Sequence, residues 1–412
     1  MNTQNREPNI RFNQFKELWK AVKLDSISKK VKSKNLNNTF ENVLTNSAEF
    51  GIIPQRDFFD KDIANLKSLN GYYVVQPNDF VYNPRISNKA PVGPIKANFL
   101  NTTGVMSPLY YVFRTQNIDV FFLAKYFDSS YWHKFMKLNG DTGARSDRFA
   151  IKDSVFKEMP IPFPSHCEQS AIGSLFRTLD DLLSSYKDNL TNYQSLKATM
   201  LSKMFPKAGH TVPEIRLDGF EGEWEINKLN KYLTVSKKKN TKQQFGKEDV
   251  LSVSGEVGIV NQIQFQGRSF AGVSVEMYSI VETGNIVYTK SPLKANPYGI
   301  IKTNYGIPGI VSTLYAVYLP NENIFPGFVE RYFENDLRLN SYLKPLVNKG
   351  AKNDMKVSDE NALLGNVIFP KLEEQRAISD YFTNLDKFIQ SHKDKISQLE
   401  TLKKKLLQEM FI

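Results

Sequence analysis

The chain has 412 residues, too many for one ordinary hydrophobic core, and its length suits two units of about 200 residues each. Lys and Arg number 54 against 43 Asp and Glu, and the net charge of +11 favours a polyanionic partner without identifying it. A single cysteine, Cys167, excludes an internal disulfide, and no apolar run is long enough for a membrane span or a signal peptide. These properties predict a cytoplasmic protein that makes no use of a membrane.

The chain repeats itself with an offset of about 205 residues. Pro8, Ile10, Arg11, Phe15 and Trp19 recur as Pro213, Ile215, Arg216, Phe220 and Trp224. Further on, Gly104, Ser107, Leu109, Tyr110 and Val112 recur as Gly309, Ser312, Leu314, Tyr315 and Val317. Between these anchors the copies differ almost everywhere. A retained frame with diverged surfaces predicts two related tasks carried out on different targets.

Each copy opens with a leading segment, residues 8–24 and 213–229, whose large aromatic side chains are expected to dock the chain on the core. Short apolar, β-branched runs between Gly, Pro and Asn clusters follow, and they are typical of strands and turns. These runs include residues 71–75, 79–83, 285–289 and 312–319. Helical spacing of apolar residues is confined to 118–136 and 325–343 in this part of each copy. The pattern predicts two similar mixed domains of the α+β class.

The last part of each copy, residues 168–205 and 374–411, has apolar residues at steps of three and four, as coiled coils do. Each helix would be roughly 60 Å long and needs a partner for its apolar stripe. The simplest partner is the other helix, and the alternative is that each folds back on its own domain. The chain order then predicts antiparallel helices with a domain at either end and an approximate two-fold axis. The predicted segments are a first domain at 1–162, a first long helix at 163–206, a linker at 207–212, a second domain at 213–368 and a second long helix at 369–412.

The sequence offers no catalytic machinery that stands out from its surroundings. Asn296-Pro297-Tyr298 partly matches the Asn-Pro-Pro-aromatic motif of amino-methyltransferases, but the second proline is missing and a turn is the simpler interpretation. No glycine-rich phosphate loop occurs, and the four histidines lie too far apart for the usual zinc spacings. We therefore predict no catalytic residue, no metal site and no cofactor in this chain.

Basic, small polar and aromatic residues gather in matching loops after a Val-Tyr strand end in each copy, and such residues contact phosphates and base edges. A Gly-basic-polar turn at 143–148 and 350–355 also suits a phosphate clamp, although plain turns and solvated loops remain alternatives. The predicted DNA-binding residues are Tyr82, Arg85, Lys89, Lys96, Ser107, Arg145 and Arg148 in the first copy, and Tyr288, Lys290, Ser291, Lys294, Lys302, Thr303, Ser312 and Lys352 in the second.

Several repeated motifs resemble the specificity subunit of type I restriction-modification systems over essentially the whole chain. These are Phe163-Pro164 and Phe369-Pro370, Glu168-Gln169 and Glu374-Gln375, Leu179-Asp180 and Leu385-Asp386, and Met204-Phe205 and Met410-Phe411. One departure is Ser165-His166-Cys167 where the second copy has Lys371-Leu372-Glu373, so the first helix is expected to dock its partner differently.

The resemblance implies that each globular domain is a target recognition domain reading one half of a split double-stranded DNA site. It also implies that the helices set the spacing and dock two modification subunits, which bind S-adenosylmethionine and methylate adenine. Through these, ATP-dependent restriction subunits would join the complex. On this reading, four residues inserted after Lys197 would lengthen the gap between half-sites by about one or two base pairs.

Two other functions are weighed against this one. A free-standing tandem DNA-binding regulator would lack a second apolar strip on the helix exterior, and Tyr193 and residues 200–204 hint at such a strip. A self-contained methyltransferase or nuclease would need the motifs that are missing.

Overall fold

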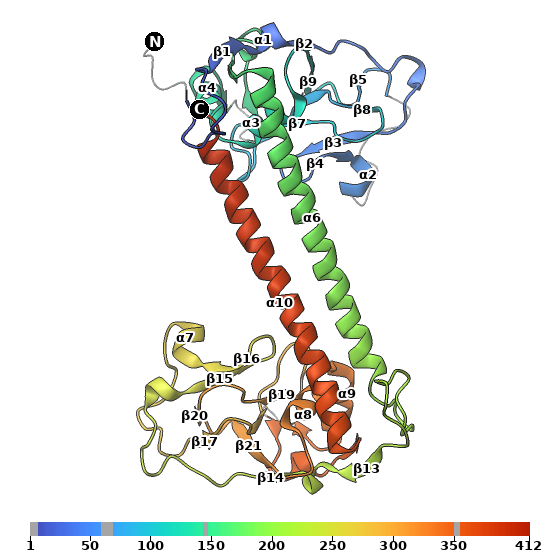
Figure 1. Ribbon diagram of the computed structural model, residues 1–412, viewed down its shortest axis with the longest axis vertical. Coiled ribbons are helices and arrows are strands. Elements are labelled where there is room, and N and C mark those ends of the chain that lie inside the picture. The colour runs from blue at the N-terminus through green and yellow to red at the C-terminus, as the bar shows by residue number, and fades with distance from the viewer. Residues whose placement is uncertain (1–6, 59–68, 143–146, 350–354) are drawn as a thin grey trace. The chain divides into compact units, whose positions relative to one another are not determined.

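The computed structural model describes residues 7–58, 69–142, 147–349 and 355–412. The chain forms two compact units: unit 1 is Met1–Lys187 with Asp394–Ile412, and unit 2 is Asp188–Lys393. The two long helices are α6, His166–Lys203, and α10, Leu372–Glu409, and both begin and end two residues before the predicted limits of the helical pattern. Each unit therefore contains a segment of both long helices (Figure 1).

Unit 1 is built on a four-stranded antiparallel sheet in the order β2-β9-β6-β7. These strands are Ser28–Lys30, Tyr111–Thr115, Phe80–Tyr82 and Ile95–Ala97. Two-stranded pairs surround it: β1 (Lys20–Lys23) with β12 (Pro160–Phe163), β3 (Leu44–Ser47) with β4 (Gly51–Pro54), β5 (Tyr73–Val75) with β8 (Gly104–Met106), and β10 (Asp141–Thr142) with β11 (Phe149–Ala150). The helices are α1 (Leu24–Ile27), α2 (Gln55–Phe58), α3 (Val120–Asp128), α4 (His133–Asn139) and α5 (Asp153–Phe156). Helix α3 packs on β7, and Phe80, Phe113 and Phe122 are fully buried between the layers.

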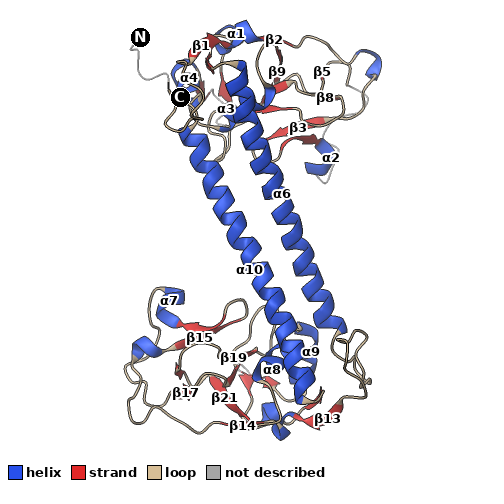
Figure 2. Ribbon diagram, in the orientation of Figure 1, coloured by secondary structure: helices blue, strands red, loops and turns tan. Residues whose placement is uncertain are grey.

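Unit 2 repeats this topology strand for strand, with a sheet in the order β14-β21-β18-β19. These strands are Leu233–Val235, Tyr315–Pro320, Ile286–Thr289 and Ile301–Thr303. The surrounding pairs are β13 (Glu225–Lys228) with β24 (Asn366–Phe369), β15 (Leu251–Ser254) with β16 (Gly258–Asn261), β17 (Ser279–Val281) with β20 (Gly309–Val311), and β22 (Asn348–Lys349) with β23 (Met355–Lys356). The helices are α7 (Gln262–Gln266), α8 (Pro326–Phe333) and α9 (Asp336–Leu343). The predicted mixed helix and strand content is confirmed (Figure 2).

The helical patterns at 118–136 and 325–343 each form two short helices instead of one. Helix α3 starts at Asp119, whose carboxylate accepts hydrogen bonds from the backbone of Phe121 and Phe122. In unit 2 the Asn335 side chain accepts a hydrogen bond from Arg338 N and so starts α9. A capping side chain favours a new helix start because it satisfies backbone N–H groups that a continuous helix would bond internally. The apolar spacing predicted helix correctly. The Asn335 cap accounts for the second helix start in unit 2, whereas the Asp119 cap marks only the start of the first helix of the pair in unit 1.

A buried ion pair explains the repeated Ile-Arg of the leading segments. In unit 1 the Arg11 guanidinium donates to both carboxylate oxygens of Glu168, at 2.7 and 2.8 Å. In unit 2 Arg216 and Glu374 form the same two bonds, at 2.8 and 2.7 Å. The exposed fraction of the carboxylate side chains is only 1% and 4%. Trp19 and Trp224 are buried beside these segments, as predicted for docking aromatics. We call each pair the Arg–Glu clamp.

The glutamine after each clamp carboxylate joins three segments of its unit. Gln169 accepts a hydrogen bond from Asp119 N at 2.9 Å and donates to Pro164 O at 2.9 Å. Gln375 accepts from Phe325 N at 2.9 Å and donates to Pro370 O at 2.9 Å. The repeated Glu-Gln motif therefore links the start of each long helix to the leading segment, to the preceding strand and to the short helices.

Within each unit the segments of α6 and α10 run antiparallel. In unit 1, Lys403 pairs with Asp180 at 2.5 Å and Glu400 pairs with Lys187 at 2.7 Å. In unit 2, Lys197 pairs with Asp386 at 2.6 Å, and Tyr193 stacks on Phe388 with ring centroids 5.9 Å apart. Residue numbers rise along one helix as they fall along its neighbour. Antiparallel packing inside each unit follows.

The first leading segment docks on the end of α10 as the second docks on the end of α6. Ile10 N donates to Glu409 O at 2.9 Å within unit 1, and Ile215 N donates to Lys203 O at 3.0 Å within unit 2. These backbone bonds satisfy carbonyl groups that the last turn of a helix leaves without an internal partner. Among the described residues, no helix combines the length and apolar character that a membrane span needs.

Candidate nucleic-acid interface

A cleft of about 720 Å³ opens in unit 1 between the β3–β4 hairpin and the loop after β6. We call it the β3–β6 cleft, and its polar lining includes Asn46, Gln55, Asn83, Arg85, Lys89 and Ser107. Three of these residues, Arg85, Lys89 and Ser107, belong to the predicted DNA-binding set. The sheet thus brings together loop residues that were predicted separately along the chain.

Two buried asparagines hold the loop that carries the arginine of this cleft. Asn83 donates to Asn46 O at 2.9 Å, and its side-chain oxygen accepts from Arg85 N at 3.0 Å. Asn46 in turn donates to Val81 O at 2.7 Å. The Asn46 Oδ1 atom is buried and has no hydrogen-bond partner among the described residues. The missing hydrogen bond of this covered atom costs free energy, and the role of Asn46 is to support the loop through its other bonds.

The charges at the cleft leave arginine side chains without strong counter-ions. Lys89 pairs with Glu49 at 2.7 Å, and both side chains are more than half exposed, so the pair adds little stability. Arg85 lies opposite Arg148 in an isolated antiparallel bridge. Within the described residues, the one ion pair of Arg148 is with Asp147, at 3.9 Å. Because like charges placed opposite each other across strands are destabilising, this arrangement favours an anionic or electron-rich ligand.

Two of the predicted unit 1 residues have structural roles, and the expectation of direct DNA contact is corrected for them. Tyr82 is buried, its hydroxyl donates to Val92 O at 3.0 Å, and burial raises its pKa. Lys96 pairs with Asp128 at 2.6 Å, and Asp128 also binds Lys125 at 3.0 Å. Burial tends to raise the pKa of Asp128, but the attraction of these two lysines outweighs it and lowers the pKa below its usual value. Arg145 lies outside the described residues.

In unit 2, three predicted residues are likewise part of the core, and the same correction applies. Tyr288 is fully buried, its hydroxyl donates to Tyr298 O at 2.7 Å, and burial raises its pKa. Lys302 is buried and pairs with Glu330 at 3.3 Å. Thr303 is buried and donates to Pro326 O at 2.9 Å. Both faces of β18 and β19 are covered, so the consecutive residues Lys302 and Thr303 are both buried although their side chains point to opposite faces.

The remaining predicted residues lie at or near the surface. Lys290 pairs with Asp359 at 2.9 Å, Ser291 is partly exposed, and Lys294 is exposed. Ser312 accepts a hydrogen bond from Leu314 N at 3.4 Å, as Ser107 does from Leu109 N in unit 1. Both serines therefore support turns. Lys352 lies outside the described residues.

The β3–β6 cleft also contains residues that the sequence did not single out, namely Asn46, Gln55, Asn83 and Asn88. They come from strand β3, from the start of α2 and from the loop that carries Arg85. The asparagines and the glutamine near matched strand ends were the sequence feature that could have indicated them. Only the pairing of distant strands shows that these residues line one cleft. In the described residues, no group of three or more His, Cys, Asp or Glu side chains could hold a metal ion.

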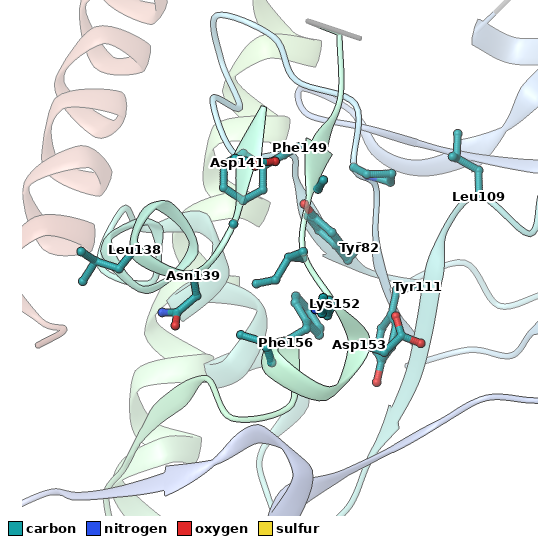
Figure 3. Close-up of a pocket in the computed structure, with 15 residues that line it drawn as sticks. Tyr82, Leu109, Tyr111, Leu138, Asn139, Asp141, Phe149, Lys152, Asp153 and Phe156 are labelled. Atoms are coloured by element: carbon teal, nitrogen blue, oxygen red, sulfur yellow. The ribbon is translucent and has the colours of Figure 1, made fainter. Parts of the chain in front are cut away.

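A second cleft of about 760 Å³ adjoins the first, since Leu109 lines both. Figure 3 shows the rings of Tyr82, Tyr111, Phe149 and Phe156 around it. Of the charged residues that line it, Asp153 forms an ion pair with Lys30, which lies 4.8 Å above the Tyr111 ring. The first cleft, with its free guanidinium and amides, is therefore the better candidate for a polar ligand.

No family model and no curated protein sequence matches the chain. Among solved structures, the type I restriction-modification S subunit from M. genitalium is 15% identical with a TM-score of 0.55, covering 98% of this chain and 99% of that one. The HsdS subunit from Thermoanaerobacter tengcongensis is 14% identical with a TM-score of 0.47, covering 95% and 96%. A chain from a study of assembly and conformational transition in the type I R-M system is 13% identical with a TM-score of 0.48, covering 97% and 99%. Along nearly its whole length, this chain has the fold of the M. genitalium S subunit.

Proposed function

We propose that this chain is the DNA-specificity subunit of a type I restriction-modification complex. Each unit reads one half of a bipartite double-stranded DNA site, and α6 and α10 set the gap and dock the modification subunits. The observation that carries the proposal is the duplication. The two units have the same topology, and each has its own Arg–Glu clamp, while their loops differ. The net charge of +11 is consistent with a DNA partner.

The loops of the two units support recognition of different half-sites. By strand register, Asn46 in unit 1 corresponds to Val253 in unit 2. The position of Arg85 in the chain after β6 corresponds to Ser291 after β18. The guanidinium of Arg85 and the hydroxyl of Ser291 form different hydrogen bonds with base edges, whereas Asn46 and Val253 are supporting residues. The two units therefore have the same strand topology but present different side chains in the loops proposed to contact DNA.

Two matched apolar pairs on the long helices support two docking surfaces for copies of one partner. Leu182 and Leu402 belong to unit 1 and are 41% and 44% exposed. Leu196 and Phe388 belong to unit 2 and are 37% and 55% exposed. In the repeat, Leu182 corresponds to Phe388 and Leu196 to Leu402, so each unit presents the same pair. These exposed pairs favour a docking subunit over a free-standing DNA-binding regulator. The residues that the sequence suggested for such a strip pack inside unit 2 instead: Tyr193 stacks on Phe388, and Leu201 and Met204 are buried.

The proposal assigns the chemistry to the partners. S-adenosylmethionine belongs to the modification subunit, and restriction subunits join through it. Purified alone with DNA and labelled S-adenosylmethionine, the chain is expected to transfer no methyl group. Co-expressed with its modification subunit in a methylation-free host, it is expected to produce one bipartite methylated motif. Replacing residues 1–162 with those of a relative should change one half of that motif, and a change in both halves would rule out independent units.

The docking surfaces can be tested one unit at a time. The double variant Leu182→Glu with Leu402→Glu is expected to weaken the binding of one modification subunit more than tenfold. The reason is that carboxylates would be buried without partners at the interface. Native mass spectrometry of the complex should then show one modification subunit instead of two. Leu196→Glu with Phe388→Glu should have the same effect, and thermal melting of this variant has to match the wild type, because Phe388 also stacks on Tyr193 inside unit 2. Gln194→Glu, which adds charge at another exposed helix position, serves as the control. Complexes that keep both subunits in the double variants would contradict docking at these pairs.

A further inference from the structure

The backbone of Arg85 is fixed by hydrogen bonds, so its side chain extends from a well-anchored position. Its N–H donates to Asn83 Oδ1 at 3.0 Å, and Asn83 is anchored to Asn46 O at 2.9 Å. Both asparagines are buried, at 3% and 7% exposure. Arg85 also forms a backbone bridge with Arg148. A side chain on such a support loses less conformational freedom on binding than one on a free loop.

Arg85 is exposed in a polar cleft. Its guanidinium forms no ion pair and no hydrogen bond with the described residues. Other arginines have protein partners: Arg11 is bound to Glu168, Arg114 is bound to Asp79, and Arg338 donates to backbone carbonyls. The one carboxylate lining the described part of the β3–β6 cleft, Glu49, is paired with Lys89. The arginine is thus left available for a ligand.

The surroundings of Arg85 distinguish a base from a phosphate as that ligand. A single cation can contact a phosphate at any sequence, so the groups beside Arg85 matter for this choice. Arg85 lines the cleft together with the amides of Gln55 and Asn88. Amides and a planar guanidinium are the groups that form paired hydrogen bonds with base edges in the major groove. Neither amide has a hydrogen-bond partner among the described residues.

We propose that Arg85 reads a guanine in the half-site of unit 1, donating two parallel hydrogen bonds to its O6 and N7 atoms. This inference rests on the proposed function, and it assigns base recognition to one side chain. The corresponding residue in unit 2 is Ser291, which has no guanidinium, so the second half-site serves as an internal control. Lys89, exposed and without a planar fork, is assigned to phosphate contact.

The first test compares Arg85→Lys and Arg85→Ala in the full chain, co-expressed with its modification subunit, by sequencing the methylated motif. Lysine keeps the charge but lacks the planar paired donors of the guanidinium, and alanine lacks both. Both variants are therefore expected to lose discrimination at one guanine of one half-site by about ten- to a hundredfold. Lys89→Ala should leave the motif unchanged and weaken DNA binding at all sites alike. An Arg85→Lys variant with an unchanged motif would assign the residue to phosphate and overturn the inference. Equal thermal melting of the variants and the wild type controls for folding.

The second test uses modified DNA with the wild-type complex. Replacing the assigned guanine by 7-deazaguanine removes the N7 acceptor and is expected to weaken binding at least tenfold. Inosine removes only the minor-groove amino group and should bind like guanine. The opposite order would place recognition in the minor groove and overturn the inference. If the wild-type complex yields no bipartite motif at all, the proposed function fails together with the inference, whereas a motif insensitive to Arg85 refutes the inference alone.

Discussion

Glu374→Ala is expected to lower the free energy of unfolding by about 3–5 kcal/mol, because it leaves the Arg216 guanidinium charged and without its partner in a buried site. The two side chains are 4% and 16% exposed and share two hydrogen bonds. Denaturant unfolding of the full chain measures the loss. Hydrogen exchange should locate it in residues 213–229, which the clamp docks on the helix start.

Three matched variants sharpen this test. Glu168→Ala removes the equivalent carboxylate of unit 1 and should cost a similar amount, with faster exchange in residues 8–24. Glu282→Ala breaks an exposed pair with Lys238 and should cost about 0–1 kcal/mol. The double change Arg216→Met with Glu374→Leu should recover most of the loss, because it removes the stranded charge. If Glu374→Ala unfolded like Glu282→Ala, the clamp would not be what holds the leading segment.

Inserting four residues into both long helices, after Lys187 in α6 and after Lys393 in α10, is expected to lengthen the gap between half-sites by about one or two base pairs. Four helical residues add about 6 Å and rotate the following residues by about 40°. One or two base pairs add about 3.4–6.8 Å and rotate the duplex in the same right-handed sense. Sequencing of the methylated motif reads the gap directly, and both half-sites should remain unchanged.

The structure corrects where such an insertion belongs. Each unit holds segments of both helices, so the insertion has to fall at the boundary between the units in both of them. Placed after Lys197 in α6 alone, as the sequence suggested, it would fall inside unit 2. There it would lie between two contacts that join the helices, the Lys197–Asp386 ion pair and the stacking of Phe205 on Phe382, so both could no longer form together. That single insertion is therefore expected to destabilise unit 2 and abolish methylation.

A two-residue insertion at the same two boundary positions is the phase control. It rotates the following residues by about 200° and should turn the apolar stripe away from its neighbour, so assembly is expected to fail. The four-residue variant should assemble normally by light scattering. If it assembled and methylated at the original spacing, these helices would not set the distance between half-sites.

The sequence by itself determined the elements whose signal is local or repeated. The duplication, the mixed α+β content and the two long helices, α6 and α10, all follow from periodic apolar spacing and matched anchors. Such spacing reports directly which face of a helix is buried, and a helix closes its backbone hydrogen bonds within itself. The repeated Arg and Glu of the clamp were visible as well, although nothing in the chain order showed that they bind each other.

Only the tertiary structure decided which residues of the matched loops reach the surface. Tyr82, Tyr288 and Thr303 lie inside, because the direction of a strand side chain depends on pairing with strands far away in sequence. The same non-local pairing brings Asn46 of β3 and Gln55 at the start of α2 to the cleft of Arg85. It also decided that each unit encloses segments of both long helices. Burial and site geometry are set by which distant segments meet, and a single sequence carries no local signal for that choice.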